Sequence, residues 1–443
     1  MASDLPVVRV GEHCRTVSDT HTLDCEQIIF LNTSDILRGE VLTDALSDTG
    51  TLPGQAKKRV ARGDILFSEI RPANGRFAIF DKPNPERYVV STKLMVLRPR
   101  PTIDTAYLYL FLTSKGTISW LQHLAESRSG TFPQITFDQI AELEIPFPPL
   151  PEQRAIAGVL GALDDKIEVN RKTARVLEGI ARAVFTSWFV DFDPVRRRAH
   201  PDNAAASPPG PAAARRAPGP APLPADLAAL FPTRLVDSPI GEVPEGWRVE
   251  GLDANIKFLN GLALQKFPPK DGRSLPVIKI AQLRKGDTEG ADRASADLDP
   301  EYIVQDGDVL FSWSGSLECV LWAGGPGALN QHLFKVTSAT LPKWFYYLWV
   351  HHHLPDFRHI AAGKATTMGH IQRHHLTQAL VTIPTDQRLM QAMDRHFAPL
   401  IESLTIRAVQ NRTLAALRDA LLPKLISGEL RIADAEKIVG RAV

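Results

Sequence analysis

The chain has 443 residues, of which 44% are hydrophobic and 23% are charged. A single hydrophobic core rarely grows beyond about 250–300 residues, so we expect at least two domains. The net charge is only +1, which excludes a generally basic nucleic-acid coat protein; any DNA-binding surface must be a local concentration of basic residues.

Other protein classes leave signals that this sequence lacks. No apolar run approaches the roughly 18 residues of a membrane span. The first residues, MASDLPVVRVGEH, have neither the basic nor the apolar region of a secretory signal. Cys14, Cys25 and Cys319 form no CxxC pair, which is typical of a reducing compartment. We therefore expect a cytoplasmic protein with no cofactor and no metal.

Along the chain, two regions alternate short β-branched and aromatic runs, such as Val89–Leu97 and Asp308–Ser312, with Gly, Pro and Asn. These runs predict strands and loops. Each region precedes a long helical pattern, and a stretch rich in Pro and Ala predicts an extended linker near the middle. The first half consists of a predicted strand region at 1–150, a helix at 151–193 and the linker at 194–235. The second half consists of a strand region at 236–384, a helix at 385–430 and a tail at 431–443.

An internal repeat relates the two strand-rich regions. Four pairs of segments match in the same order, roughly 240 residues apart. One architectural unit is therefore expected to occur twice. The pairs are Gly63–Ser68 with Gly307–Ser312, Ile36–Glu40 with Gln282–Asp287, Tyr107–Leu112 with Trp344–Trp349, and Ile145-Pro146 before Gln153-Arg154 with Ile383-Pro384 before Gln387-Arg388.

Both predicted helices carry a narrow apolar stripe at alternating steps of four and three residues, which is typical of a coiled-coil seam. Asn170 is the one polar residue of the first stripe, where it would select register and partner. The second stripe is less clean, with seven of ten positions apolar, and Asn411 again lies near its middle. Packing of each helix on its own domain is the alternative. If the helices instead pair with each other, an antiparallel arrangement would place the strand-rich regions at opposite ends. The predicted seam residues are Ile156, Leu160, Leu163, Ile167, Asn170, Leu177, Val184, Trp188, Phe397, Leu400, Leu404, Asn411, Leu414 and Leu421.

At these helices the sequence resembles a known family, the specificity subunits of type I restriction-modification systems. Pro149–Ile156, continuing through Leu163–Ile167 and Ser187–Pro194, is similar to the family's central conserved region. Leu414–Leu430 is similar to its distal conserved region, and Gly241–Trp247 resembles the usual opening of the second target-recognition domain. The Pro- and Ala-rich insertion after Asp193 is longer than the family pattern.

The resemblance implies an α+β fold in which two repeated α/β target-recognition domains are separated by two long antiparallel helices forming a coiled coil. It further implies that each domain reads one half of a bipartite double-stranded DNA site. The helices would dock two modification (methylase) subunits, and restriction (helicase-nuclease) subunits would join them. The chain itself would be a DNA-recognition subunit and not an enzyme.

The sequence offers little chemistry of its own. Pro83–Glu86 lacks the second Pro and the aromatic residue of an adenine-methyltransferase loop, and Gly363–Ala365 lacks the glycine and hydroxyl of a Walker loop. His370 and His374 are one helical turn apart without the Glu of HExxH, and His351–His353 form a further cluster. Solvated or core histidines are favoured over a metal site, although His370 is also a candidate for a phosphate or base edge.

Two loops in each half are candidates for DNA contact, because basic residues bind phosphates while Arg, Asn and Gln read base edges. In the first half these are a basic cluster, whose alternative is an ordinary solvated face, and a small hydroxyl-rich loop. In the second half Trp313 has a core position as its alternative. The predicted DNA-binding residues are Lys57, Lys58, Arg59, Arg62, Ser68, Arg71, Asn74, Arg76, Arg128, Thr131, Gln134, Trp313, Ser314, Ser316, Lys364, Thr366, Thr367, His370, Gln372 and Arg373.

Two other functions compete with this reading. One is a stand-alone methyltransferase with an embedded specificity domain, and the missing catalytic loop counts against it. The other is a coiled-coil scaffold with only protein ligands, and the duplicated domains with their basic loop weigh against it.

Overall fold

The structure is a computed structural model that describes residues 5–128, 133–199, 223–270, 272–363 and 369–443, without the side chains of Arg128 and Ala199. The chain forms two compact units, and each contains one strand-rich region and part of each long helix. Unit 1 comprises Met1–Ile167 and Thr413–Val443, and unit 2 comprises Glu168–Arg412. None of the helices among the described residues is both long and apolar enough for a membrane span.

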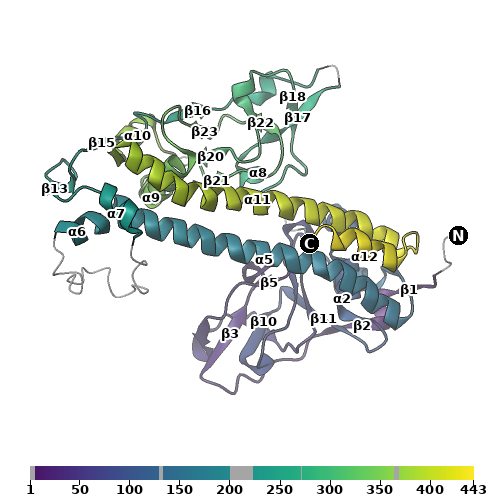
Figure 1. Cartoon of the computed structure of the whole chain (residues 1–443). Coiled ribbons are helices and arrows are strands. Elements are labelled where there is room, and N and C mark those ends of the chain that lie inside the picture. Colours follow the sequence, from purple (N-terminus) through teal and green to yellow (C-terminus); the bar gives the residue numbers. More distant parts are fainter. Residues whose placement is uncertain (1–4, 129–132, 200–222, 271, 364–368) are drawn as a thin grey trace. The chain divides into compact units, whose positions relative to one another are not determined.

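Unit 1 contains two four-stranded sheets (Figure 1). One sheet is antiparallel throughout and has the strand order β2-β11-β8-β9. Its strands in this order are Cys14–Val17, Leu94–Pro99, Ile65–Ser68 and Phe77–Ile79. The order β6-β3-β10-β7 contains one parallel pair, β3 with β10: Leu46–Asp48, Gln27–Leu31, Tyr88–Ser91 and Ala56–Lys58. Two short pairs are β1-β12 and β4-β5: Val7–Arg9 with Glu144–Pro146, and Ile36–Leu37 with Glu40–Val41.

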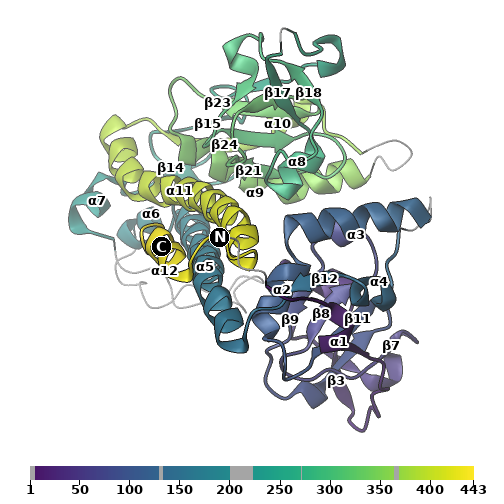
Figure 2. The ribbon, with the colours of Figure 1, turned by 90° about the vertical axis from the view of Figure 1, so that its right-hand side faces the viewer.

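In the chain order of unit 1, α1 lies between β1 and β2, and α2 to α4 follow β11. Figure 2 shows α3 at the opposite end of the unit from β3. The α-helices that lie wholly in this unit are α1 (Val10–His13), α2 (Thr105–Leu112), α3 (Lys115–Arg128), α4 (Phe137–Ala141) and α12 (Ile432–Gly440). The 3-10 turns are η1 (Thr33–Asp35), η2 (Thr49–Thr51), η3 (Pro72–Asn74) and η4 (Pro85–Arg87).

Unit 2 repeats these sheets. The antiparallel order β16-β23-β20-β21 is Lys257–Asn260, Leu333–Thr337, Val309–Ser312 and Cys319–Leu321. The mixed sheet has the strand order β18-β17-β22-β19, in which β17 is parallel to β22. Its strands in this order are Arg293–Ser295, Ser274–Ile278, Gly327–Leu329 and Ile303–Val304. Two short pairs are β15-β24 and β13-β14: Trp247–Gly251 with Leu380–Pro384, and Leu235–Val236 with Val243–Pro244. Its helices and 3-10 turns are α6 (Asp193–Ala199), α7 (Ala225–Leu230), α8 (Ile280–Lys285), α9 (Lys343–Ala362), α10 (Arg373–Gln378), η7 (Leu264–Lys266) and η8 (Pro300–Tyr302).

The two four-stranded sheets and the β1-β12 pair of unit 1 have counterparts in unit 2, whereas the β4-β5 and β13-β14 pairs do not correspond to each other. In the matching sheets, the same neighbours pair in the same sense, and each mixed sheet contains a single parallel pair in the corresponding place. This confirms the internal repeat predicted from the sequence.

The shared Gly-Asp of the repeat is a structural turn. Gly63 and Gly307 have φ of 87° and 89°, which favours glycine because it has no Cβ. The following Asp64 and Asp308 each accept a backbone hydrogen bond from the residue three positions earlier, at 2.7 and 2.8 Å. Each Asp also forms an ion pair with a cation on the adjacent strand, Arg98 of β11 or Lys335 of β23. The turn thus fixes the start of β8 in unit 1 and of β20 in unit 2.

The match between Ile36–Glu40 and Gln282–Asp287 holds in position but not in local structure. Both segments follow a strand of the parallel pair. In unit 1, Arg38 and Gly39 have φ of 44° and 98° and close the β4-β5 hairpin. In unit 2 the glycine comes one residue later, at Gly286, where its φ of 77° ends helix α8 instead.

The two long helices are α5 (Leu150–Phe189) and α11 (Gln387–Ile426) (Figure 1). In unit 1 the beginning of α5 shares a core with the end of α11, and in unit 2 the end of α5 shares a core with the beginning of α11. The helices are therefore antiparallel neighbours within each unit. Every predicted seam residue is buried or half-buried. These cores also contain strand and helix residues of the same unit, so the helices pack on their own domains as well as on each other.

Two predicted segments differ from the structure. The ends of the predicted linker form helices α6 and α7, and the predicted tail contains α12. Val195, Leu227 and Phe231 are buried in the core of unit 2, and Ala435 and Val439 in that of unit 1. The few apolar residues in these segments are spaced so that each short helix buries them together, which overall composition does not reveal.

Candidate nucleic-acid interface

In unit 1 the structure brings together the two loops that the sequence selected separately. The loop after β8 and the loop after α3 form an antiparallel bridge between Ile70 and Gln134. The Arg71 N–H donates to the Pro133 carbonyl at 3.1 Å, and the Ile135 N–H donates to the Glu69 carbonyl at 2.9 Å. We call this junction the loop corner of unit 1.

Unit 2 has the same junction between the loop after β20 and the loop after α9. Ser314 bridges His370 in antiparallel register. The Gly315 N–H donates to the Gly369 carbonyl at 2.8 Å, and the Ile371 N–H donates to the Trp313 carbonyl at 3.0 Å. Backbone bonds therefore pair position for position in the two loop corners, so Arg71 corresponds to Gly315 and Gln134 to His370.

The loop corner of unit 1 is held from two further sides. The Ala73 N–H of η3 donates to Gln122 Oε1 on α3 at 3.1 Å, and the Arg38 N–H of the β4-β5 hairpin donates to the Gly75 carbonyl at 2.7 Å. Arg71 and Asn74 are exposed, and their side chains have no ion pair or hydrogen bond among the described residues. A rigid backbone thus presents a guanidinium and an amide to solvent.

Four of the predicted residues are engaged inside unit 1. Lys58 Nζ donates to the carbonyls of Thr92 and Leu94 at 3.0 and 2.8 Å, and burial lowers the pKa of Lys58. Arg76 donates to the carbonyls of Ser34 and Ile36, and the Ser68 hydroxyl bonds to the backbone of Ile70. Arg62 differs, because its ion pair with Asp81 lies on the surface with both side chains exposed.

Lys57 and Arg59, on either side of Lys58, are exposed. Their side chains have no hydrogen bond or ion pair among the described residues. Within the predicted basic cluster, these two residues together with Arg71 and Asn74 are therefore the groups best placed to meet a phosphate or a base.

In unit 2 several predicted residues have internal partners. Trp313 Nε1 donates to Asn260 Oδ1 at 2.9 Å, and its ring packs against the core, while Ser314 is buried beside His332. Arg373 donates to the Phe258 carbonyl and lies over the Phe334 ring, although it is exposed. The other exposed predicted residues here are Ser316 and Gln372, and His370 is half-buried with its ring near Trp313.

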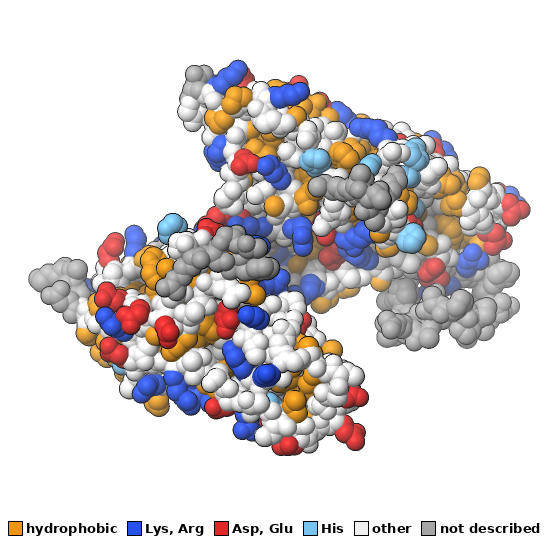
Figure 3. All heavy atoms as spheres, turned by 180° about the vertical axis from the view of Figure 1, so that it is seen from behind, with side chains coloured by type: hydrophobic (Ala, Val, Ile, Leu, Met, Phe, Trp, Pro, Cys, Tyr) orange, Lys and Arg blue, Asp and Glu red, His pale blue; other side chains and the backbone are white. Residues whose placement is uncertain are grey.

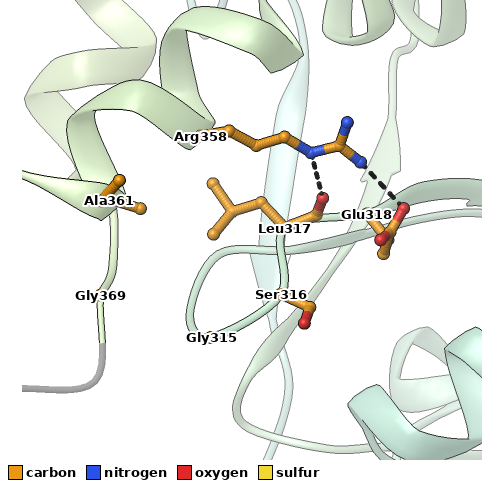
Figure 4. Close-up of a pocket in the computed structure, with 8 residues that line it drawn as sticks. Gly315, Ser316, Leu317, Glu318, Arg358, Ala361 and Gly369 are labelled. Atoms are coloured by element: carbon orange, nitrogen blue, oxygen red, sulfur yellow. Dashed lines mark hydrogen bonds and ion pairs between the residues drawn. The ribbon is translucent and has the colours of Figure 1, made fainter. Parts of the chain in front are cut away.

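A cavity of ≈ 420 Å³ lies beside the loop corner of unit 2. Figure 4 shows Arg358 reaching from α9 to the loop, where it donates to the Leu317 carbonyl at 2.9 Å and to Glu318 at 3.0 Å. These bonds tie the β20-β21 loop to α9. Thr131, Lys364, Thr366 and Thr367 lie outside the described residues, and so does the side chain of Arg128.

Sequence reasoning missed Arg38. It is exposed on the β4-β5 hairpin, against the η3 turn of the loop corner. The Leu-Arg-Gly of the internal repeat was the available signal, but its turn conformation was not apparent from the sequence.

The histidine cluster is part of the fold of unit 2. His351 and His353 lie on α9, and burial lowers the pKa of both to about 4. His353 Nε2 lies 3.0 Å from the Leu380 carbonyl, and its ring stacks on Trp349. Within the described ranges, no group of three or more His, Cys, Asp or Glu side chains is arranged to hold a metal ion.

Charge on the visible surface is mixed. Figure 3 shows Lys and Arg side chains interspersed with Asp and Glu on the faces of both units. This agrees with the net charge of +1.

Comparison with known proteins identifies the class. Residues 14–178 match the family model described as type I restriction modification DNA specificity domain. The type I restriction enzyme HindI specificity subunit of Haemophilus influenzae is 30% identical, over 97% of this chain and 100% of the relative. The MjaIX specificity subunit of Methanocaldococcus jannaschii is 27% identical over 84% of this chain and 79% of the relative.

A solved structure of a type-I restriction-modification system S subunit from M. genitalium aligns with a TM-score of 0.47 and 14% identity, over 96% of this chain and 97% of that one. The sequence relatives establish that this chain belongs to the family of type I restriction enzyme specificity subunits.

Proposed function

We propose that this chain reads a bipartite double-stranded DNA target, one half-site with each unit, on behalf of separate modification and restriction subunits, and that it is not catalytic by itself. The observation that carries the proposal is the duplication of the two four-stranded sheets, which repeats the loop corner in both units. A duplicated reading domain of one fold, carrying different loop residues, suits an asymmetric target in two parts.

The long helices support an unread spacer between the half-sites. Each has 40 residues, or about 60 Å at 1.5 Å per residue. This exceeds one DNA turn of about 34–36 Å. The helix pair would therefore act as a ruler that sets the spacer length.

The ruler is tested by lengthening both helices together. One heptad is inserted after Thr173 in α5 and another after Ile406 in α11, because Asn170 and its partners on α11 fix which residues of the two helices face each other. Seven residues add about 10 Å, so methylation mapping should find both half-sites unchanged and the spacer longer by up to about three base pairs. A heptad in one helix alone is the control and should abolish methylation. A spacer that stayed fixed in the double insertion would rule out the ruler.

An exposed apolar stripe supports docking of the modification subunits. Val169, Val176 and Ile180 of α5 are 55%, 60% and 47% exposed, and their spacing places them on one face of the helix, away from the seam. Exposed apolar clusters of this kind mark protein interfaces. Val176→Glu should prevent co-purification with the modification subunit without lowering the melting temperature. Thr186→Glu, at an exposed position on another face of α5, is the matched control, and equal binding by both variants would count against docking here.

The competing functions are separated by the purified chain and its complex. Methylation of DNA by the chain alone would indicate a stand-alone methyltransferase. A complex with the modification subunit that shows no preference for any duplex over competitor DNA in a gel shift would indicate a scaffold. We expect sequence-selective binding by the complex and no methylation by the chain alone.

A further inference from the structure

Arg71 occupies a backbone conformation that arginine avoids. Its φ and ψ are 45° and 77°, in the left-handed region. There the Cβ of an L-residue crowds the following carbonyl oxygen, so the conformation is disfavoured for all residues except Gly and, to a lesser degree, Asn and Asp.

Among the described residues, Leu23, Arg38, Asn84 and Phe192 also have a positive φ, but the two places most similar to that of Arg71 hold Gly or Asn. In unit 2 the corresponding residue is Gly315, with φ of 65° and the equivalent backbone hydrogen bond. Within unit 1, Asn84 has φ of 55° and precedes a proline that opens a 3-10 turn, just as Arg71 precedes Pro72. Gly and Asn are the residues that tolerate this geometry, so the fold does not require arginine at position 71.

Within the part of the chain that the structure describes, nothing gives the Arg71 side chain a structural role. It is exposed and has no hydrogen-bond or ion-pair partner among the described residues, while its backbone is fixed by Pro133 and by η3. A strained residue held by its neighbours, with an unengaged side chain, points to a function of that side chain. Unlike the Gly or Asn that this backbone conformation favours, arginine offers a planar fork of hydrogen-bond donors.

We propose that Arg71 is a specificity-determining residue of unit 1 that reads one guanine in the major groove, by donating to its O6 and N7. This rests on the proposed function, because it assumes that unit 1 reads a half-site. Arg on guanine is the commonest specific contact in the major groove, and the fork fits that base edge in two places at once. Gly315 has no side chain, so unit 2 reads its half-site without this contact.

The test uses the complex with the modification subunit. Methylation mapping with the unchanged chain first defines the motif. The absence of a bipartite motif would reject the proposed function, and with it the half-site that Arg71 is proposed to read, whereas a bipartite motif whose discrimination is unchanged in the Arg71 variants would reject the role of Arg71 alone. Binding is then measured by fluorescence anisotropy at fixed salt, on duplexes in which each G·C pair of the motif is replaced in turn by A·T. Arg71→Gly removes the fork and relieves the backbone, Arg71→Lys keeps the charge without the fork, and Asn84→Gly is the matched left-handed control.

We expect both Arg71 variants to lose about tenfold or more of the discrimination at one G·C pair of one half-site, while the other half-site keeps its preferences. Asn84→Gly should bind like the unchanged chain, and Arg71→Gly should melt no lower than it. A uniform loss on all duplexes, discrimination by Arg71→Lys equal to that of the unchanged chain, or a lowered melting temperature of Arg71→Gly would each overturn the proposal.

Discussion

Replacing Asn170 with alanine should destabilise unit 2 by about 3 kcal/mol, because Asn170 holds a buried polar layer between the two long helices. It is 1% exposed. Its Nδ2 donates to Gln410 Oε1 and Asn411 Oδ1, each at 2.9 Å, and its Oδ1 accepts from Arg407 Nη1 at 3.1 Å. Two neutral hydrogen bonds contribute about 0.5–1.5 kcal/mol each and the bond from the guanidinium about 1.5–3. Arg407 Nε is already buried without a partner among the described residues, so the guanidinium has little alternative.

Thermal unfolding followed by circular dichroism measures this effect. A loss of about 3 kcal/mol corresponds to a fall of roughly 6–12 °C in the melting temperature of a unit of this size. Val169→Ala, at a neighbouring position that is 55% exposed, is the control and should change stability by less than about 0.5 kcal/mol. Asn170→Leu separates the polar term from lost volume, since it fills the space but leaves Arg407 and Asn411 without their partner. An Asn170→Leu variant as stable as the unchanged chain would refute the reasoning.

Two further predictions concern Lys57 with Lys58, and the buried histidines. Lys57→Ala should leave the melting temperature unchanged but weaken binding of the complex to all DNA sequences, and the slope of log affinity against log salt concentration should become shallower by about one unit. Lys58→Ala should instead destabilise unit 1 by about 1–3 kcal/mol, because two carbonyls lose their donor. The reverse pattern in anisotropy and melting would contradict this assignment. Burial lowers the pKa of His351 and His353 from 6.5 to about 4. Between these pH values the folded unit 2 therefore binds fewer protons than the unfolded chain does. The contribution of the two neutral histidines to stability should be complete above about pH 6.5 and decline as the pH falls toward 4. Melting temperatures across this range would test it, with His353→Phe expected to reduce the decline and a pH-independent melting temperature as the contrary result.

The sequence by itself determined the organisation of this protein. The four-and-three spacing predicted both long helices to within a few residues, because an extended apolar stripe on a helix has few ways to be buried. The repeated Gly-Asp predicted the duplication, because that turn needs a left-handed glycine in both units. The few apolar residues near the linker and in the tail carried too weak a pattern, so α6, α7 and α12 went unrecognised.

Only the tertiary structure decided which candidate residues are available to a ligand. Lys57 and Lys58 are adjacent and chemically identical, yet Lys57 faces solvent, whereas Lys58 donates to the carbonyls of Thr92, in the turn before β11, and of Leu94, at the start of β11. Arg71 and Arg76 are separated in the same way, by contacts with segments more than thirty residues away in the chain. The pairing of each β8 or β20 loop with a loop some 60 residues later is equally invisible to local pattern. Backbone hydrogen bonds between distant segments set these positions, and local residue preferences do not encode them.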